Sequence, residues 1–195
     1  MKKVFTILAA MLLTVGAFAQ SSTWKTDASH SNVKFSVTHL VVSEVEGYFK
    51  TFAGTLVSSK PDFTDAAINF SVDINSINTD NEGRDKHLKS DDFFNAEKFP
   101  QMTFKSTSFK KVGDKKYVLE GDLTIRDITK KVKFDVVFGG TVKDPWGNIK
   151  AGFKATGSIN RFDYNLKWNS VTEAGGAVVS KEVAITLNLE FAQQK

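Results

Sequence analysis

The sequence predicts an all-β protein built as one eight-stranded antiparallel barrel, with a short helical insertion between the third and fourth strands. Apolar and polar residues alternate with a period of two in eight segments, which is the pattern of a strand with one buried face. Turn-forming residues separate these segments, as in a meander of hairpins. Closing eight amphipathic strands into a barrel removes exposed sheet edges, although a two-sheet sandwich fits the same alternation.

Each predicted strand presents one apolar and one polar face. In the first segment Val33, Phe35 and Val37 alternate with polar residues, and the last segment repeats the pattern from Val183 to Phe191. The alternation is weaker in the second, fourth, fifth and seventh segments. In chain order the strands are predicted at residues 32–38, 48–57, 68–74, 102–109, 117–125, 131–138, 149–159 and 182–191.

Two connections predict hairpins and one predicts a long loop. Gly113-Asp114-Lys115 indicates a short hairpin, and Asp144-Pro145-Trp146-Gly147-Asn148 indicates a longer one. Residues 161–181 lack alternation and contain Gly175-Gly176, so we expect a long loop there.

A charged segment predicts the helical insertion. Residues 77–100 contain the run from Arg84 to Lys89, then Phe93 and Phe94, and end at Pro100. We expect a short helix that packs over an edge or an end of the sheet through its apolar residues.

The first residues have the features of an export signal. The pair Lys2-Lys3 precedes an apolar stretch from Val4 to Phe18, and Ala17-Phe18-Ala19 supplies small residues at a signal-peptidase site. No later segment approaches the length of a transmembrane helix. We therefore predict a cleaved signal peptide at residues 1–19, one domain at residues 20–195, a periplasmic or secreted location, and no stable membrane span after cleavage.

Charge and cysteine content exclude several classes of function. Without Lys2 and Lys3, 24 of the 26 basic residues remain against 22 acidic ones, a net charge of +2. This small charge predicts no nucleic-acid partner. Because the sequence has no cysteine, disulfide scaffolds, thiol nucleophiles, iron–sulfur clusters and Cys-ligated zinc are excluded.

No residue pattern in the sequence points to catalysis or to a metal site. Asp27, His30 and Ser31 place an acid, an imidazole and a hydroxyl close together, but a polar turn before a strand explains them better than a relay. The spacing of His30, His39 and His87 matches no metal motif, and no nucleophile elbow, P-loop or dinucleotide fingerprint is present. We predict no enzyme activity, no catalytic residue, no metal and no cofactor.

Phenylalanine is unusually frequent, with 17 copies, and many of them fall on the apolar strand faces. A small barrel either fills its interior with side chains or holds one ligand, and the residues alone leave both open. A transmembrane barrel is a third alternative, disfavoured because aromatic girdles are lacking at the strand ends. The residues predicted to line a ligand-binding lumen are Phe35, Val37, Phe49, Phe52, Phe70, Val72, Ile74, Phe104, Leu119, Leu123, Phe134, Val136, Phe138, Phe153, Ile185 and Leu187.

Several motifs resemble those of a known family. Asp27-x-x-His30-Ser31, Phe35-x-Val37-x-His39 and Gly47-x-Phe49-x-x-Phe52-x-Gly54 look like the start of a YceI-like protein. The most specific block runs from Arg84-Asp85-x-His87-Leu88-Lys89-Ser90 through Asp92-Phe93-Phe94 to Phe99-Pro100-x-x-x-Phe104. Gly121-x-Leu123-Thr124-Ile125-Arg126 and Arg161-Phe162-Asp163-Tyr164 complete a resemblance that covers residues 24–191.

The resemblance implies an extended, lipocalin-like barrel, exported to the periplasm, that carries or stores a polyisoprenoid or another long-chain amphiphilic lipid in its lumen. It implies a binding protein rather than an enzyme, and a homodimer as a possible assembly. The candidate neighbours of the lipid headgroup are His39, Arg84 and Arg161. Tyr164-Asn165 departs from the aromatic residue and glycine of many relatives, so we expect that loop to sit differently at the barrel mouth. A ligand-free structural or partner-binding barrel is the alternative, followed by an enzyme acting on isoprenoid lipids.

Overall fold

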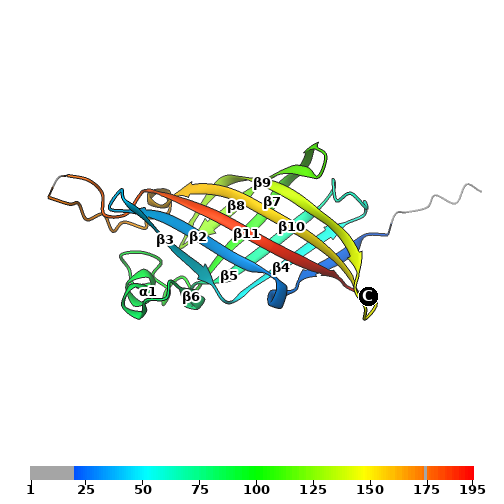
Figure 1. The fold of residues 1–195 in the computed structure, drawn as a ribbon, viewed down its shortest axis with the longest axis horizontal. Coiled ribbons are helices and arrows are strands. Elements are labelled where there is room, and N and C mark those ends of the chain that lie inside the picture. The colour runs from blue at the N-terminus through cyan, green and yellow to red at the C-terminus, as the bar shows by residue number, and fades with distance from the viewer. Residues whose placement is uncertain (1–19, 174) are drawn as a thin grey trace, which may run out of the picture.

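The computed structural model describes residues 20–173 and 175–195, and the predicted signal peptide at residues 1–19 lies outside this part. The described chain forms a closed antiparallel barrel with one short α-helix, which confirms the predicted fold class (Figure 1). The elements are β1 (Ser22–Thr26), η1 (Ala28–His30), β2 (Asn32–His39), β3 (Ser43–Phe49), β4 (Phe52–Ser58), β5 (Ala67–Asp73), η2 (Ile74–Ser76), β6 (Ile77–Asn78), α1 (Glu82–Lys89), β7 (Gln101–Gly113), β8 (Lys116–Ile125), β9 (Ile128–Lys143), β10 (Ile149–Asn160), η3 (Arg161–Tyr164) and β11 (Glu182–Gln193).

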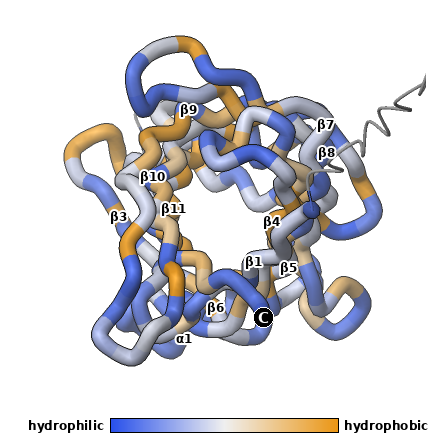
Figure 2. The backbone as a smooth tube through the Cα atoms, turned by 90° about the vertical axis from the view of Figure 1, so that its right-hand side faces the viewer, coloured by the Kyte–Doolittle hydropathy of each residue, from blue (hydrophilic) through white to orange (hydrophobic). Residues whose placement is uncertain are grey.

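Pairing between the first and last strands closes the barrel. The strand order is β1-β4-β5-β7-β8-β9-β10-β11, and β11 returns to β1 with Thr26 opposite Phe191. Further along, β11 pairs with β2, which pairs with β3, and β3 pairs with β6. Viewed from its end, the backbone therefore forms a ring (Figure 2).

Short breaks divide three of the eight strands of the ring. The turn η1 separates β1 from β2, Lys50 and Thr51 separate β3 from β4, and η2 separates β5 from β6. The prediction of one unbroken strand at residues 48–57 is therefore wrong. The second and third breaks lie side by side, because Lys50 N donates to Ser76 O (3.1 Å) and Asp73 N donates to Thr51 O (2.9 Å). The backbone groups at these breaks therefore keep hydrogen-bond partners, including Thr51 N, which donates to Ser76 Oγ (3.0 Å).

The predicted helix and both hairpins are confirmed. Asn81 caps α1 by accepting a hydrogen bond from Arg84 N (2.9 Å), and α1 covers one end of the barrel (Figure 1). Asp114 and Lys115 join β7 to β8, and residues 144–148 join β9 to β10. No helix in residues 20–173 and 175–195 has the length and apolar character to cross a membrane.

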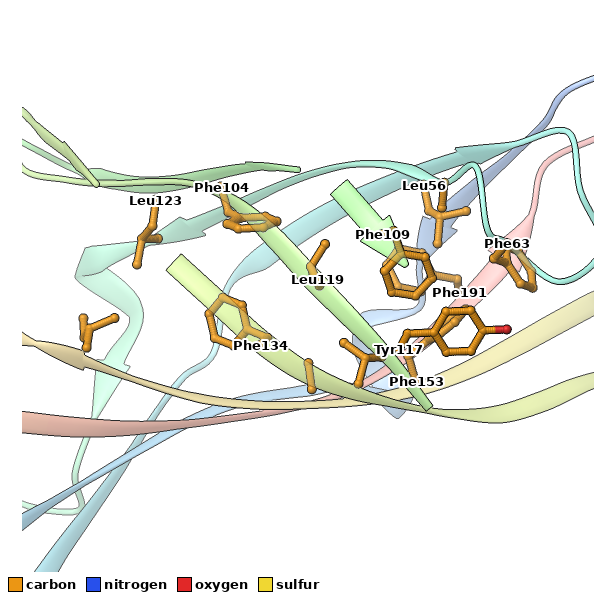
Figure 3. Close-up of a cluster of buried hydrophobic side chains, with 14 of the residues drawn as sticks. Leu56, Phe63, Phe104, Phe109, Tyr117, Leu119, Leu123, Phe134, Phe153 and Phe191 are labelled. Carbon is orange, nitrogen blue, oxygen red and sulfur yellow. The ribbon is translucent and has the colours of Figure 1, made fainter. Parts of the chain in front are cut away.

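Aromatic side chains close the end of the barrel opposite α1. The Phe63 ring lies 5.3 Å from Trp24, 5.5 Å from Phe138 and 5.3 Å from Phe153, between ring centroids. The loop that carries Phe63 is fixed by Tyr117, whose hydroxyl donates to Asp62 O (2.8 Å). Figure 3 shows Phe63 and Tyr117 beside the inward-facing residues of this end. We call this end the closed end and the α1 end the open end.

Apolar side chains face the interior of the barrel and polar side chains face outward. On β8, for example, Tyr117, Leu119 and Leu123 are buried, whereas Lys116 and Glu120 are exposed. This orientation is opposite to that of a transmembrane barrel, whose apolar side chains face lipid.

Candidate ligand-binding site

The barrel encloses a cavity of about 330 Å³. This volume falls at the lower end of the range that ligand pockets occupy. Its wall comes from the inward faces of β2 to β5 and β7 to β11. Most of the residues predicted to line a lumen do line it: Phe35, Val37, Phe49, Phe70, Val72, Phe104, Leu119, Leu123, Phe134, Val136, Phe153, Ile185 and Leu187.

The remaining predicted lumen residues, Phe52, Ile74 and Phe138, do not line the cavity. Phe52 lies directly after the break in the second strand and stacks on Phe70, with 5.8 Å between ring centroids. Ile74 is in η2 rather than in a strand, and it is buried in a second apolar cluster with Phe49. Phe138 packs against Phe63 at the closed end. The strand pattern places all three apolar side chains on the inward face. Phe52 and Ile74 lie at breaks in the strands, and Phe138 lies at the closed end, so none of them borders the cavity.

Glycines explain how a barrel so rich in phenylalanine keeps an open interior. The Phe35 ring lies over Gly47 and the Phe70 ring over Gly54, each on the neighbouring strand, so closely that an added Cβ would collide with the ring. Phe104 lies over Gly121 in the same way, and Phe134 lies over Gly157. Each ring therefore packs against the wall instead of projecting into the lumen.

The helical insertion and the long loop supply wall residues that the strand pattern could not predict. They are Leu88, Phe93, Phe94, Leu166, Trp168, Val178 and Val179. The available signal was the set of large apolar residues within otherwise polar, non-alternating segments.

The cavity opens at the α1 end. Inward-facing residues there, such as Val37, Val45 and Val179, are only half-buried. At the other end, Phe153 and Phe191 are 8% and 2% exposed. A ligand can therefore reach the cavity between β2, α1 and the loop after η3.

The polar side chains that line the cavity carry no negative charge. They include His39, Arg84, His87 and Arg161, and within residues 20–173 and 175–195 neither aspartate nor glutamate lines the cavity. Two of them are held by neighbours: Arg84 Nε donates to Thr79 Oγ1 (2.8 Å), and His87 Nε2 contacts Asp92 Oδ2 (2.9 Å). Within the described residues, Arg84 has no carboxylate in ion-pair distance. The mouth is therefore suited to a group that accepts hydrogen bonds or is negatively charged.

Arg161 is buried, with 2% of its surface exposed, and it organises the loop after η3. Its Nε donates to Ser180 O (2.9 Å), its Nη1 to Leu166 O (2.8 Å) and Trp168 O (2.6 Å), and its Nη2 to Val179 O (3.2 Å). Burial lowers the pKa of the guanidinium. Arg161 thus donates to four backbone carbonyls, whereas Arg84 donates to one, Thr79 O, at 2.7 Å from its Nη2.

The Asp27 motif is structural. Asp27 caps η1 by accepting from Ser29 N (3.1 Å) and also accepts from Lys150 Nζ (2.6 Å). His30 and Glu190 lie close enough to Asp27 for their ligand atoms to surround one ion. However, Lys150 Nζ is 3.1 Å from Glu190 Oε1, so an ammonium group already occupies the position of a cation.

Comparisons with known proteins agree with this architecture. The model of the YceI-like domain family matches residues 24–191. The chain is 39% identical to the Protein YceI of Salmonella newport (strain SL254) over 190 residues, which is 96% of this chain and 95% of that protein.

Solved structures show the same fold. A Campylobacter jejuni YceI protein has a TM-score of 0.70 and 31% identity, covering 81% of this chain and 90% of that one. A polyisoprenoid binding domain from Saccharophagus degradans has a TM-score of 0.63 at 17% identity, covering 88% and 98%. The family match, the sequence identity and the shared barrel together show that this chain belongs to the YceI-like family.

Proposed function

We propose that this protein binds a long-chain isoprenoid or a similar amphiphilic lipid, with the tail in the barrel and the headgroup at the open end. The observation that carries the proposal is an apolar cavity with one closed and one open end. Its wall follows β11 from Val183 to Phe191, a strand length of roughly 26 Å. A linear chain fits such a space better than a compact ligand.

Burial of the tail provides the affinity. Each buried methylene group contributes about 0.8 kcal/mol, so a chain of many carbons binds tightly without polar contacts. The name of the Saccharophagus degradans domain, a polyisoprenoid binding domain, supports an isoprenoid as the ligand class. The two proteins share a fold, and the apolar cavity of this chain supports a lipid ligand independently of that likeness.

The headgroup is proposed to contact Arg84 and His39 and to accept hydrogen bonds or carry negative charge. Both residues line the open end, and Arg84 has no acidic partner within the described residues. Arg161 also lines the cavity, but it contributes positive potential rather than a free donor, because its donors are bound to backbone carbonyls. Replacing Arg84 by Gln should weaken binding of a prenyl phosphate more than binding of the corresponding alcohol, with Lys86→Gln on the same helix as the matched control.

We further propose that the protein is exported and acts as a carrier or store without a catalytic step. The basic, apolar and small-residue pattern of residues 1–19 supports export. The lining residues include no activated nucleophile and no acid–base pair, which supports binding without turnover.

The direct test is mass spectrometry of the protein purified gently from its own exporting cell, first in native form and then after organic extraction. A stoichiometric lipid that is lost on extraction would support the proposal and identify the ligand. A second arm uses Leu187→Trp, which fills the cavity, and Val137→Trp, whose side chain faces outward and is 49% exposed, as the control. Leu187→Trp should abolish lipid binding, and Val137→Trp should retain it. If the gently purified wild type carries no lipid, the barrel is instead structural or binds a protein partner.

A further inference from the structure

The open end carries an exposed aliphatic turn that the barrel does not use for its own packing. The turn between β2 and β3 consists of Leu40, Val41 and Val42, whose side chains are 41%, 75% and 83% exposed. We call these residues the aliphatic tip. Most apolar side chains of this size are buried in folded proteins, so a contiguous exposed set at one point of the surface calls for an explanation.

The backbone of the aliphatic tip makes this choice of residues more unusual. Leu40 and Val41 have φ angles of 51° and 65°, in the left-handed region that disfavours β-branched side chains. Hairpin turns of this kind favour Asn and Gly, which adopt positive φ at little cost. Stability of the fold alone would therefore favour polar or small residues at these positions. The aliphatic residues found there are strained and do not improve folding.

The aliphatic tip is held firmly beside the mouth of the cavity. Leu40 N donates to Val178 O (2.9 Å), and Ser180 N donates to Thr38 O (2.9 Å). Val178 and the preceding β2 residue Val37 both line the cavity. Figure 1 shows the β2–β3 turn and the loop before β11 together at the α1 end. The tip therefore lies directly beside residues that line the cavity.

We propose that the aliphatic tip inserts into the surface of a lipid bilayer and brings the mouth of the cavity against it. A lipid could then pass between bilayer and cavity without crossing water. This inference rests on the proposed lipid-binding function. It adds the source from which the ligand is loaded, or the surface to which it is delivered.

A bilayer fits the tip better than a protein partner does. A stable protein interface buries about 800 Å² on each partner, far more than a projecting turn of three side chains offers. A fluid lipid surface, by contrast, can surround a convex apolar projection. Residues 35–49 contain no lysine or arginine, and Glu44 and Glu46 follow the tip. Apolar insertion, not attraction to anionic lipid, is therefore the expected mode, and it should be insensitive to salt.

The test measures transfer of dansyl-labelled geranylgeraniol from phosphatidylcholine vesicles to the full mature protein. The variant is Val41→Asp/Val42→Asp, and the matched control is Val112→Asp/Val142→Asp, two side chains on other hairpins that are each 63% exposed. We expect the tip variant to slow transfer at least tenfold and the control to transfer at the wild-type rate. Adding salt to about 1 M, or phosphatidylglycerol to the vesicles, should change the wild-type rate little.

A second variant guards against damage to the fold. Leu40→Asn/Val41→Gly replaces two tip side chains with residues that suit positive φ, so it should fold at least as well as the wild type and still slow transfer. Both tip variants should bind the same probe with unchanged affinity when it is delivered from detergent.

The outcomes separate the two proposals. Absence of wild-type binding from detergent would overturn the proposed function itself. Wild-type binding from detergent, with equal vesicle transfer by the wild type and both tip variants, would overturn only the insertion of the tip. A third outcome is a wild type that sediments as a dimer and does not bind vesicles, together with tip variants that sediment as monomers. That outcome would show that the tip contacts a second copy of the chain instead of a bilayer.

Discussion

At the scale of single residues, Arg161 shows how one buried side chain can order a long loop. Its guanidinium donates to the carbonyls of Leu166, Trp168, Val179 and Ser180, which belong to both ends of the loop between η3 and β11. Residues Trp168 and Val179 also line the cavity. The planar fork of arginine can serve several carbonyls at once, which a lysine ammonium cannot do with the same geometry.

Replacing Arg161 by Lys should therefore destabilise the protein by about 2–4 kcal/mol, because buried carbonyls lose their donors. Urea unfolding of the two proteins measures this difference. The conservative change Lys167→Arg, at an exposed position of the same loop, should stay within about 0.5 kcal/mol. An equally stable Arg161→Lys protein would mean that solvent replaces the lost donors.

The group around Lys150 makes stability depend on pH. The Lys150 hydrogen bond, followed by those of Ser29 and His30, holds the pKa of Asp27 well below its ordinary value of 3.8. A lowered native pKa stabilises the fold above the ordinary pKa, and this contribution is lost as the pH falls through the native pKa. Asp27 and Lys150 are 19% and 15% exposed, so solvent screens the pair only in part.

Replacing Lys150 by Met should cost about 2–3 kcal/mol at neutral pH, because Asp27 and Glu190 then lie close together without a cation. As the pH falls below about 4 towards the native pKa of Asp27, the wild type progressively loses the Asp27 contribution, so the difference in stability between the two proteins should narrow. Denaturant unfolding across this range measures both effects. If the difference in unfolding free energy between the two proteins stayed the same at every pH, Asp27 would not be the titrating group.

At the scale of elements, the strand pattern predicted the wall of the cavity but not its interruptions. Alternation depends on one face being buried, and that holds for β8 and β10 along nearly their whole length. The break at Lys50 and Thr51 depends instead on contacts with Ser76, which is distant in sequence. The short strand β1 was also not predicted, because its five residues are too few to establish a period.

The same limit applies to the candidate site. Leu88 and Val178 reach the cavity only because the closed barrel brings α1 and the loop before β11 to the same mouth. Sequence reasoning identified the phenylalanines, but it could not decide between a filled interior and a cavity. That question depends on the glycines of neighbouring strands, such as Gly121 beneath Phe104.

Replacing Gly121 by Ala tests this arrangement. An added Cβ would overlap the Phe104 ring and the Lys105 carbonyl oxygen, so we expect a loss of about 1–3 kcal/mol and a ring displaced toward the lumen. Gly152→Ala is the matched control, since an added Cβ there has no atom within 4 Å. Unfolding measurements and probe-binding titrations should both separate the two variants. Equal behaviour would mean that the rings can move without cost.

At the scale of the whole molecule, the barrel divides into a packed end and an open end. Trp24, Phe63 and Phe138 fill the closed end. Around the cavity, Ile185 and Leu187 remain only half-buried because their neighbours across the lumen do not reach them. These lumen-facing side chains thus present apolar surface that a ligand tail would cover.

Ligand binding should therefore stabilise the whole barrel. At a free ligand concentration one hundred times the dissociation constant, linkage adds about 2.7 kcal/mol, which raises the melting temperature of a domain of this size by roughly 5–10 °C. Thermal unfolding of lipid-extracted protein, with and without added long-chain isoprenol, measures the shift. Leu187→Trp should melt at the same temperature in both conditions because its side chain occupies the space of the tail, whereas Val137→Trp should respond as the wild type does. If Leu187→Trp showed the full shift in melting temperature, the ligand would have to bind outside the lumen, because the tryptophan side chain fills the space that the tail would occupy.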